Sequence, residues 1–257
     1  VPLLGAARTS QDATQTDSKN REMKKIILKT RALGFQWETA DPFLFCVHHE
    51  DNYPAGNEEM GPDPTELNGR FIGQDFILKD GWRMYHGSAV PGFPGHPHRG
   101  FETITVVREG VVDHADSTGA AGRYGNGDVQ WMTAGRGVIH SEIPQQEEGV
   151  MEGFQLWLNL AGKDKMCQPW YRDFKAEEVP QFTQHDGVRV SVIAGESHGT
   201  QGAVTRPTTT PIYLDVHLPK GTSFSQALDA GMNAFVYVYR GSVQINGQEV
   251  GVQRMGL

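Results

Sequence analysis

The sequence predicts an all-β protein of antiparallel strands, and three observations support this prediction. β-Branched runs such as residues 103–107 end at glycine-containing turns, which is typical of the strands of sandwiches and barrels. Apolar and polar residues alternate over 154–160, as expected for a strand with two different faces. A β-like run with an Arg before a Gly turn occurs at 104–112 and again at 235–243. This repeat predicts two similar β units in the chain.

The composition agrees with a folded protein and limits its possible functions. The chain has 257 residues, enough for one large or two modest domains, and its 38% of hydrophobic residues allows a packed core. The net charge of −8 argues against broad binding of nucleic acids or anionic membranes, which depends on clustered Lys and Arg. The negative charge is still compatible with binding to a basic patch on a protein partner. No run of 18 apolar residues occurs, so we expect no membrane-spanning helix.

Residues 1–22 differ from the rest of the chain. Residues 1–7 are small or apolar, whereas 8–22 are polar and contain no large core-forming side chain. A disordered tail is the favoured interpretation. Translated upstream sequence or another non-native leader is the second, since the first methionine is Met23. The end of a secretory signal is the third, although the charged segment that begins such signals is absent.

The first β unit is expected to cover residues 23–162. Its strands are predicted, in chain order, at 25–29, 42–49, 70–78, 82–88, 103–107 and 154–160. A loop rich in Gly, Pro, Asn and acidic residues is predicted at 51–69. Cys46 and Cys167 are interpreted as buried free thiols, and a disulfide between them stays open as the alternative.

The second β unit is expected to cover residues 163–257 and to begin with a linker. Its strands are predicted at 188–194, 211–218, 233–239 and 242–245. Asn246 and Gly247 predict a type I′ hairpin turn. A closed barrel would need further strands after this hairpin, so the unit is expected to be incomplete and to expose strand edges.

Four candidate metal ligands form two pairs. His96 and His98 are two residues apart, and so are His140 and Glu142. Alternate residues of a strand point to the same face, so each pair can direct two ligands at one point. A mixed site of imidazoles and a carboxylate suits non-haem Fe(II), Mn, Ni or Cu, and zinc remains an alternative.

The sequence around these pairs resembles the two motifs of the cupins and, in detail, those of the pirin family. The first string reads His-Pro-His-Arg-Gly-Phe-Glu-Thr from His96, and the second reads Gln-Trp-Met-Thr-Ala-Gly-Arg-Gly-Val-Ile-His-Ser-Glu up to Glu142. The resemblance covers roughly residues 40–246. It implies two tandem antiparallel cupin barrels, a bicupin, with one metal ion in the first barrel. The second barrel has no HxH motif before its strand run, so we expect it to be metal-free.

The resemblance offers two carboxylates for the fourth ligand. The general cupin pattern would use Glu102, whereas the pirin pattern uses the Glu two residues after the last His, which is Glu142. We favour Glu142, which leaves Glu102 either to orient a histidine or to lie on the surface. His114 is interpreted as an ordinary polar or half-buried residue, and the glycines at 135–137 as a tight turn.

The pirin-like pattern also implies an activity. Pirin-like cupins resemble quercetinases, which open the central ring of flavonols such as quercetin with O2. By this resemblance a divalent metal, with Fe(II) favoured over Cu, Mn, Ni and Zn, would bind the flavonol, and Glu142 would accept its proton as general base. Four residues are candidates for an aromatic-binding pocket and equally for plain core: Phe93, Phe101, Trp131 and Met132.

Two other functions stay open. Some pirin-like proteins are iron-dependent, redox-sensing regulators that bind transcription factors or metabolic enzymes without catalysis, which gives the alternative here. A metal-stabilised β scaffold without catalysis is the third. We expect a cytoplasmic monomer or dimer that binds a small aromatic substrate and O2 and has no direct nucleic-acid or membrane partner.

Overall fold

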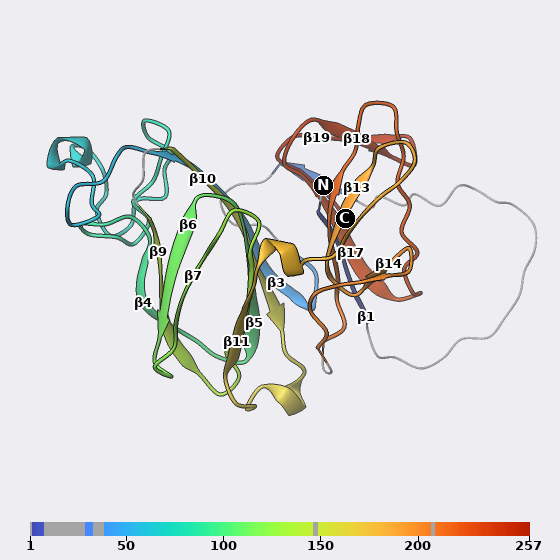
Figure 1. Cartoon of the computed structure of the whole chain (residues 1–257), viewed down its shortest axis with the longest axis horizontal. Coiled ribbons are helices and arrows are strands. Elements are labelled where there is room, and N and C mark those ends of the chain that lie inside the picture. Colours follow the sequence, from blue (N-terminus) through green and yellow to red (C-terminus); the bar gives the residue numbers. More distant parts are fainter. Residues whose placement is uncertain (1, 8–28, 33–38, 146–148, 207–208) are drawn as a thin grey trace, which may run out of the picture. The chain divides into compact units, whose positions relative to one another are not determined.

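The computed structural model describes residues 2–7, 29–32, 39–145, 149–206 and 209–257. Contacts divide the chain into a first unit, Phe35–Glu178, and a second unit, Val1–Gly34 with Val179–Leu257 (Figure 1). The all-β prediction is confirmed, because the described residues form strands and three short 3-10 helices and contain no α-helix. These helices are η1 (Pro64–Leu67), η2 (Gly162–Asp164) and η3 (Ala176–Glu178).

Two antiparallel sheets form the first unit. They face each other across a shared interior, and residues of both line one cavity there (Figure 1). The larger sheet has the order β11–β8–β5–β10–β3, with β3 (Phe43–Tyr53), β5 (Phe101–Glu109), β8 (Val129–Thr133), β10 (Gly149–Asn159) and β11 (Trp170–Phe174). The smaller sheet has the order β4–β9–β6–β7, with β4 (Phe93–His98), β6 (Val111–Asp116), β7 (Ala121–Gly125) and β9 (Val138–Pro144).

Strand β10 lies between β5 and β3, and its alternating sequence explains both of its faces. Leu156 is fully buried on one face. Gln155 and Trp157 alternate with it and point to the opposite face, where Trp157 contacts the ring of His98 and Gln155 donates a hydrogen bond to Glu142. The predicted alternation is therefore present, and its more polar set is the one that faces the interior between the sheets.

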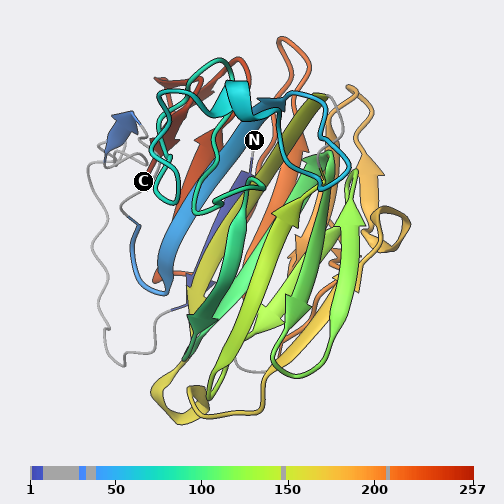
Figure 2. The same ribbon diagram turned by 90° about the vertical axis from the view of Figure 1, so that its left-hand side faces the viewer.

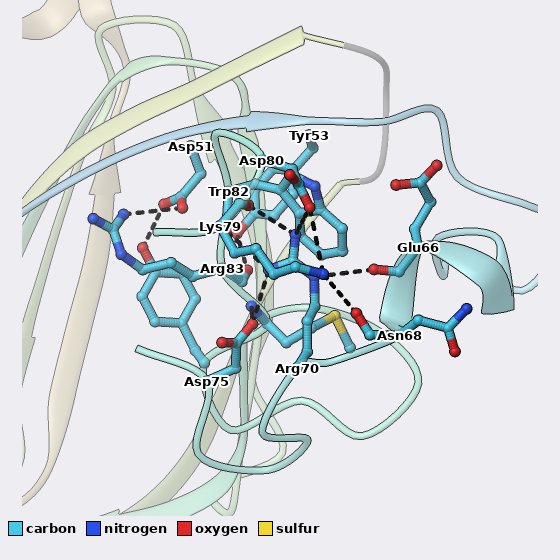
Figure 3. A network of polar contacts seen from close by, with 12 residues as sticks. Asp51, Tyr53, Glu66, Asn68, Arg70, Asp75, Lys79, Asp80, Trp82 and Arg83 are labelled. Atoms are coloured by element: carbon cyan, nitrogen blue, oxygen red, sulfur yellow. Dashed lines mark hydrogen bonds and ion pairs between the residues drawn. The ribbon is translucent and has the colours of Figure 1, made fainter. Parts of the chain in front are cut away.

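Residues 54–92 connect β3 to β4 without a regular strand, and in Figure 2 this segment, drawn mostly in cyan, lies over one end of the first unit. The strands predicted at 70–78 and 82–88 are wrong, because only isolated β-bridges occur there. The physical reason is Arg70, whose buried guanidinium binds backbone carbonyl groups on both sides of the turn between these segments (Figure 3). The segment is thus fixed by a side chain rather than by a strand ladder.

The second unit is built on one long sheet. Its order is β12–β13–β16–β1–β17–β20–β2, with β1 (Pro2–Ala7), β2 (Thr30–Ala32), β12 (Gln181–Thr183), β13 (Arg189–Ala194), β16 (Ile212–His217), β17 (Met232–Val238) and β20 (Arg254–Gly256). Two small hairpins complete it, β14 (Glu196–Ser197) with β15 (Thr200–Gln201), and β18 (Ser242–Ile245) with β19 (Gln248–Gly251). Asn246 and Gly247 both have positive φ, at 49° and 78°, as the predicted type I′ turn requires.

Strand β1 lies where a disordered tail or leader was expected. Its backbone pairs with β16 on one side and β17 on the other, with Leu3 opposite both Leu214 and Val236. These partners are about 200 residues away in sequence, so no local pattern could reveal the pairing. Residues 8–22 of the expected tail lie outside the described residues, as does most of the strand predicted at 25–29.

The unit boundaries differ from the expected ones at 22/23 and 162/163. They fall at Gly34 and at Glu178. The first shift arises because β1 and β2 pair within the sheet of the second unit. The second arises because β11 pairs with β8 of the first unit, which carries the predicted linker into that unit.

Both cysteines are free thiols, with Cys46 buried and Cys167 partly exposed. The favoured interpretation of Cys46 is therefore confirmed. No helix within the described ranges combines the length and the apolar character needed to cross a bilayer.

Candidate metal centre

Three histidines converge in the interior of the first unit. Strands β4 and β9 are antiparallel neighbours, with His96 opposite His140 and His98 opposite Val138. Alternation along each strand therefore places the three imidazoles on one face of the smaller sheet. One nitrogen of each ring lies within 4.8 Å of a nitrogen of each other ring. Small side-chain adjustments would let a single ion bind all three.

Two of these rings have a buried nitrogen without a hydrogen-bond partner. Among the described residues, no group binds Nε2 of His98 or Nε2 of His140. An unsatisfied buried polar atom costs free energy unless a ligand binds it. In His96, Nδ1 lies 2.9 Å from the carbonyl oxygen of Pro94 and must donate to it, so the lone pair of the neutral ring is on Nε2. This set of nitrogens fits a metal ion that accepts imidazole.

Burial keeps His98 and His140 in the form that binds metals. Burial, with smaller contributions from His140 and His96, lowers the pKa of His98 to about 3. Burial also lowers the pKa of His140 to about 4, against the opposite effect of Glu142. Both rings are therefore neutral near pH 7 and offer a lone pair without first losing a proton.

Glu142 lies beside the three histidines but is not one of the three clustered residues. Its Oε2 is 3.8 Å from Nε2 of His140, while Nε2 of Gln155 donates to both carboxylate oxygens at 3.0 and 2.9 Å. The hydroxyl of Tyr124 donates to Oε1 at 3.2 Å. Burial alone would raise the pKa of Glu142, but His140 and the bond from Gln155 outweigh it and hold the pKa below its usual value. The carboxylate is thus ionised and hydrogen-bonded next to the histidines, and its role as fourth ligand stays a prediction.

Two neighbouring residues are more deeply buried than expected. Glu102 is fully buried on β5 and accepts a hydrogen bond of 2.7 Å from the hydroxyl of Thr133, so the surface alternative for Glu102 is wrong. His114 is only 2% exposed. Its Nδ1 lies 3.4 Å from Nδ1 of His140, and its Nε2 lies 3.3 Å from Oδ2 of Asp116. The half-buried interpretation of His114 is wrong, and its contact with His140 depends on the register of β6 with β9 and not on local sequence.

An aromatic wall, made of Phe45, Phe101 and Trp157, covers the His98 side of the cluster. The rings of Phe101 and Trp157 stack with centroids 4.7 Å apart, and both centroids are 5.0 Å from that of His98. Phe45 adds a third ring 4.7 Å from Trp157. All three side chains are partly exposed, so a ligand near the cluster can reach them.

The predicted pocket residues divide into two groups. Phe101 belongs to the aromatic wall, and Phe93 lies on the other side, with its ring 6.3 Å from that of His96. Trp131 and Met132 are buried in the core, as the alternative interpretation held. Trp157 was missed, although its alternation with the leucines of β10 was visible and placed it on the face of Gln155.

A small cavity borders Glu142. Its volume of about 30 Å³ is enough for a molecule the size of water. Its walls come from both sheets and are His49, Phe93, Thr105, Val107, Val112, Tyr124, Glu142, Pro144, Met151, Gly153 and Gln155.

The other histidines lie outside the cluster. Nε2 of His48 is hydrogen-bonded to Oε1 of Glu152 at 3.2 Å, and His86 is exposed and bonds the carbonyl oxygen of Gly73. Three belong to the second unit, His185, His198 and His217. Within the described residues, the only group of three potential metal-ligating side chains is the one formed by His96, His98 and His140.

Comparison with known proteins places this site in a family. The family model for pirin matches residues 27–158. A Pseudomonas aeruginosa protein named "Putative quercetin 2,3-dioxygenase" is 47% identical over 193 residues, which cover 73% of this chain and 66% of that protein. Human pirin is 44% identical over 171 residues, covering 66% of this chain and 57% of the human protein. The matched part thus spans less than two thirds of the length of each of these relatives.

Solved structures share the fold. A quercetin 2,3-dioxygenase from Acinetobacter baumannii superposes with a TM-score of 0.65 at 25% identity, covering 89% of this chain and 77% of the other. A Geobacillus kaustophilus protein gives a TM-score of 0.63 at 25% identity, covering 90% and 84%. Both likenesses extend over both units, and the tandem cupin fold is confirmed. The family model and the close relatives together show that the chain belongs to the pirin family.

Proposed function

We propose that this chain is a metal-dependent dioxygenase that cleaves flavonols such as quercetin with O2. The observation that carries the proposal is one interior surface that combines three histidine nitrogens, an ionised carboxylate and an aromatic wall. Similarity to proteins with quercetin 2,3-dioxygenase in their names supports it.

The metal would be held by His96, His98 and His140, with Glu142 as the proposed fourth ligand. Bound there, Fe(II), or Cu, Mn, Ni or Zn in its place, would supply the Lewis acidity and, for the redox-active ions, the one-electron chemistry that O2 requires. Gln155 donates to both oxygens of the Glu142 carboxylate and would orient it beside the ion.

The protein's own part is to orient the flavonol and to take up its proton. The aromatic wall offers ring faces against which a planar aromatic substrate can stack. Glu142 is ionised and can accept the proton of a flavonol hydroxyl on a carboxylate oxygen. Gln155 joins these two functions, because it accepts from Nε1 of Trp157 at 2.9 Å and donates to Glu142.

Metal content and O2 uptake test this proposal together. We expect elemental analysis to find about one metal ion per chain, as a single three-histidine site requires, and O2 uptake on addition of quercetin. His98→Ala should abolish both, whereas His86→Ala, which changes an exposed histidine outside the cluster, should leave both unchanged. Bound metal without O2 uptake would contradict the dioxygenase.

Replacement of Glu142 by Gln tests its role as base separately from folding. The substitution keeps the shape and removes the charge, so we expect kcat to fall by roughly 10²- to 10⁴-fold. The thermal midpoint of the metal-free protein should change little by comparison. Unchanged turnover would remove Glu142 from the chemistry.

One observation favours the regulatory alternative as a second candidate. The segment 71–78 carries four exposed large apolar side chains, with Phe71 76% and Ile77 70% exposed, beside Ile72 and Leu78. Exposed apolar patches of this kind often contact other proteins. If this function holds, Phe71→Ser with Ile77→Ser should abolish iron-dependent binding of a protein partner and leave O2 uptake unchanged. The cytoplasmic location and the monomeric or dimeric state stay predictions.

A further inference from the structure

We propose that Asp116 and His114 form a positioning relay that fixes which nitrogen of His140 carries hydrogen. The relay holds the lone pair of His140 on Nε2, the nitrogen that lies 3.8 Å from Oε2 of Glu142 and has no hydrogen-bond partner among the described residues. The proposal rests on the metal site of the proposed function, but it concerns the metal-free ring and is tested without turnover.

The pairing of β6 with β9 brings the three residues together. In this register Asp116 lies opposite His140, and His114 lies opposite Glu142. His114 and Asp116 are two residues apart, so both side chains project from the same face of β6 as their partners on β9. The side chains of His114 and His140 have no exposed area, and that of Asp116 is 3% exposed. Water therefore does not compete for these hydrogen bonds.

The first link runs from Asp116 to His114. Oδ1 of Asp116 accepts from the backbone amide and the hydroxyl of Thr118 and from the amide of Ala120, at 2.7, 2.6 and 3.3 Å. These bonds fix the carboxylate and leave Oδ2 facing Nε2 of His114 at 3.3 Å. A carboxylate can only accept, so Nε2 of His114 carries the hydrogen. In the neutral ring, the lone pair is then on Nδ1.

The second link runs from His114 to His140. Their Nδ1 atoms are 3.4 Å apart. With the neutral ring of His114 offering its Nδ1 lone pair, Nδ1 of His140 has to carry the hydrogen and donate it. The lone pair of His140 is therefore on Nε2, the atom that has no hydrogen-bond partner among the described residues.

This tautomer has to be imposed by the protein. A free histidine side chain in water prefers to carry its hydrogen on Nε2, and in that form Nε2 could not bind a metal. Groups that hold the other nitrogen of a metal-binding histidine contribute about 10- to 100-fold to metal affinity. The carbonyl oxygen of Pro94 holds the hydrogen of His96 on Nδ1, and the relay holds that of His140 on Nδ1.

Imidazole ¹⁵N–¹H correlation spectra of the metal-free protein test the relay directly. The wild type should show His140 with hydrogen on Nδ1 and His114 with hydrogen on Nε2. In His114→Phe, which keeps a ring but has no acceptor, His140 should move toward the Nε2–H form. Asp116→Asn can donate to His114 and should shift His140 in the same direction. His86→Phe, at an exposed site outside the cluster, should leave the His140 signals unchanged.

Metal affinity, measured by competition with a chelator, provides the second readout. We expect His114→Phe and Asp116→Asn to weaken Ni(II) binding by about 10- to 100-fold, with the His86→Phe control unaffected. The proposal would be overturned if His140 in the wild type carried its hydrogen on Nε2. If His114→Phe fails to fold, Asp116→Asn decides: an unchanged tautomer of His140 in that variant would overturn the proposal. Loss of affinity with no change of tautomer would also overturn it, since the role would then be structural. Absence of quercetin turnover in the wild type would contradict the proposed function but would not affect the test of the relay, because the spectra are recorded without substrate or metal.

Discussion

Asp51 is a buried carboxylate whose ionisation the fold opposes. It accepts hydrogen bonds from the hydroxyl of Tyr85 and, at 3.0 Å, from Nη1 of Arg83, which Figure 3 shows beside it. Burial raises the pKa of Asp51 from 3.8 to about 6, because these two bonds do not fully compensate for lost hydration. The folded protein therefore holds a proton on Asp51 over a range of pH in which the unfolded chain has lost it.

This difference predicts that the wild type loses stability, relative to Asp51→Asn, as pH rises from about 4 to about 7. The folded state binds more protons in this window, so its free energy of unfolding falls with rising pH. A shift of about two units corresponds to about 3 kcal/mol. Asn keeps an acceptor for Tyr85 and Arg83 but does not titrate.

Urea unfolding of both proteins across this pH range measures the difference. Burial lowers the pKa of His49 to about 3, so His49 makes the fold less stable as pH falls below about 6.5, opposite to the effect of Asp51. Subtracting the unfolding free energy of Asp51→Asn from that of the wild type removes this contribution. A difference in unfolding free energy that stays constant between pH 4 and 7 would contradict the raised pKa of Asp51.

At the scale of elements, the segment 54–92 depends on one arginine. The side chain of Arg70 is fully buried and donates to Asp75 and to the carbonyl oxygens of Glu66, Lys79 and Trp82, at distances from 2.8 to 3.1 Å (Figure 3). Its guanidinium also lies 3.4 Å above the ring of Trp82. Strand β4, the first histidine strand, follows this segment directly.

Arg70→Met should therefore loosen the whole segment. The substitution leaves the buried carboxylate of Asp75 without its charge partner, and we expect a loss of about 3–5 kcal/mol in unfolding free energy. Hydrogen exchange at the amides of Met84 and Tyr85, which bond to Asp75, should accelerate. Lys79→Met is the matched control, because replacing this half-exposed lysine should lower the unfolding free energy by less than about 1 kcal/mol. Equal effects of the two substitutions would refute the special role of Arg70.

The turn that joins β8 to β9 has a steric requirement for glycine. Gly135 has a φ of 50°, and a Cβ there would lie 2.3 Å from the carbonyl oxygen of Cys167. Gly137 also has a positive φ, of 135°, so the predicted tight turn at 135–137 is confirmed. The position of His140, three residues later, depends on this turn.

Gly135→Ala should destabilise the protein and disturb the metal centre. Strain from the clash and the positive φ is expected to cost about 1–3 kcal/mol, and affinity for Ni(II) should fall with it. Gly162→Ala is the control, because a Cβ at Gly162 meets nothing within 4 Å. Thermal unfolding and chelator competition measure both effects, and equal stability of the two variants would show that the turn tolerates a side chain.

At the scale of the whole molecule, local sequence patterns predicted most strands, whereas pairing between distant strands determines which site residues meet and where β1 lies. Alternation placed His96 and His98 on one face, yet their meeting with His140 depends on the register of β4 with β9. The contact of His114 with His140 depends on the register of β6 with β9 in the same way. The pairing of β1 inside the second sheet had no local signal at all. Motif resemblance supplied the site residues, because it carries information on such non-local pairing.

Metal binding should stabilise the first unit, because all three clustered histidines lie in it. An ion that binds the folded state at about 1,000 times its Kd adds about 4 kcal/mol to the free energy of unfolding. The five tryptophans of the chain also lie between residues 35 and 178, so tryptophan fluorescence follows this unit, whereas far-UV circular dichroism follows both. We expect anaerobic Fe(II), or Ni(II), to raise the midpoint of the fluorescence transition in the wild type and to leave that of His98→Ala unchanged. An equal rise in both proteins would mean that the ion binds elsewhere in the chain, and no rise in either would mean that these three nitrogens do not hold a metal.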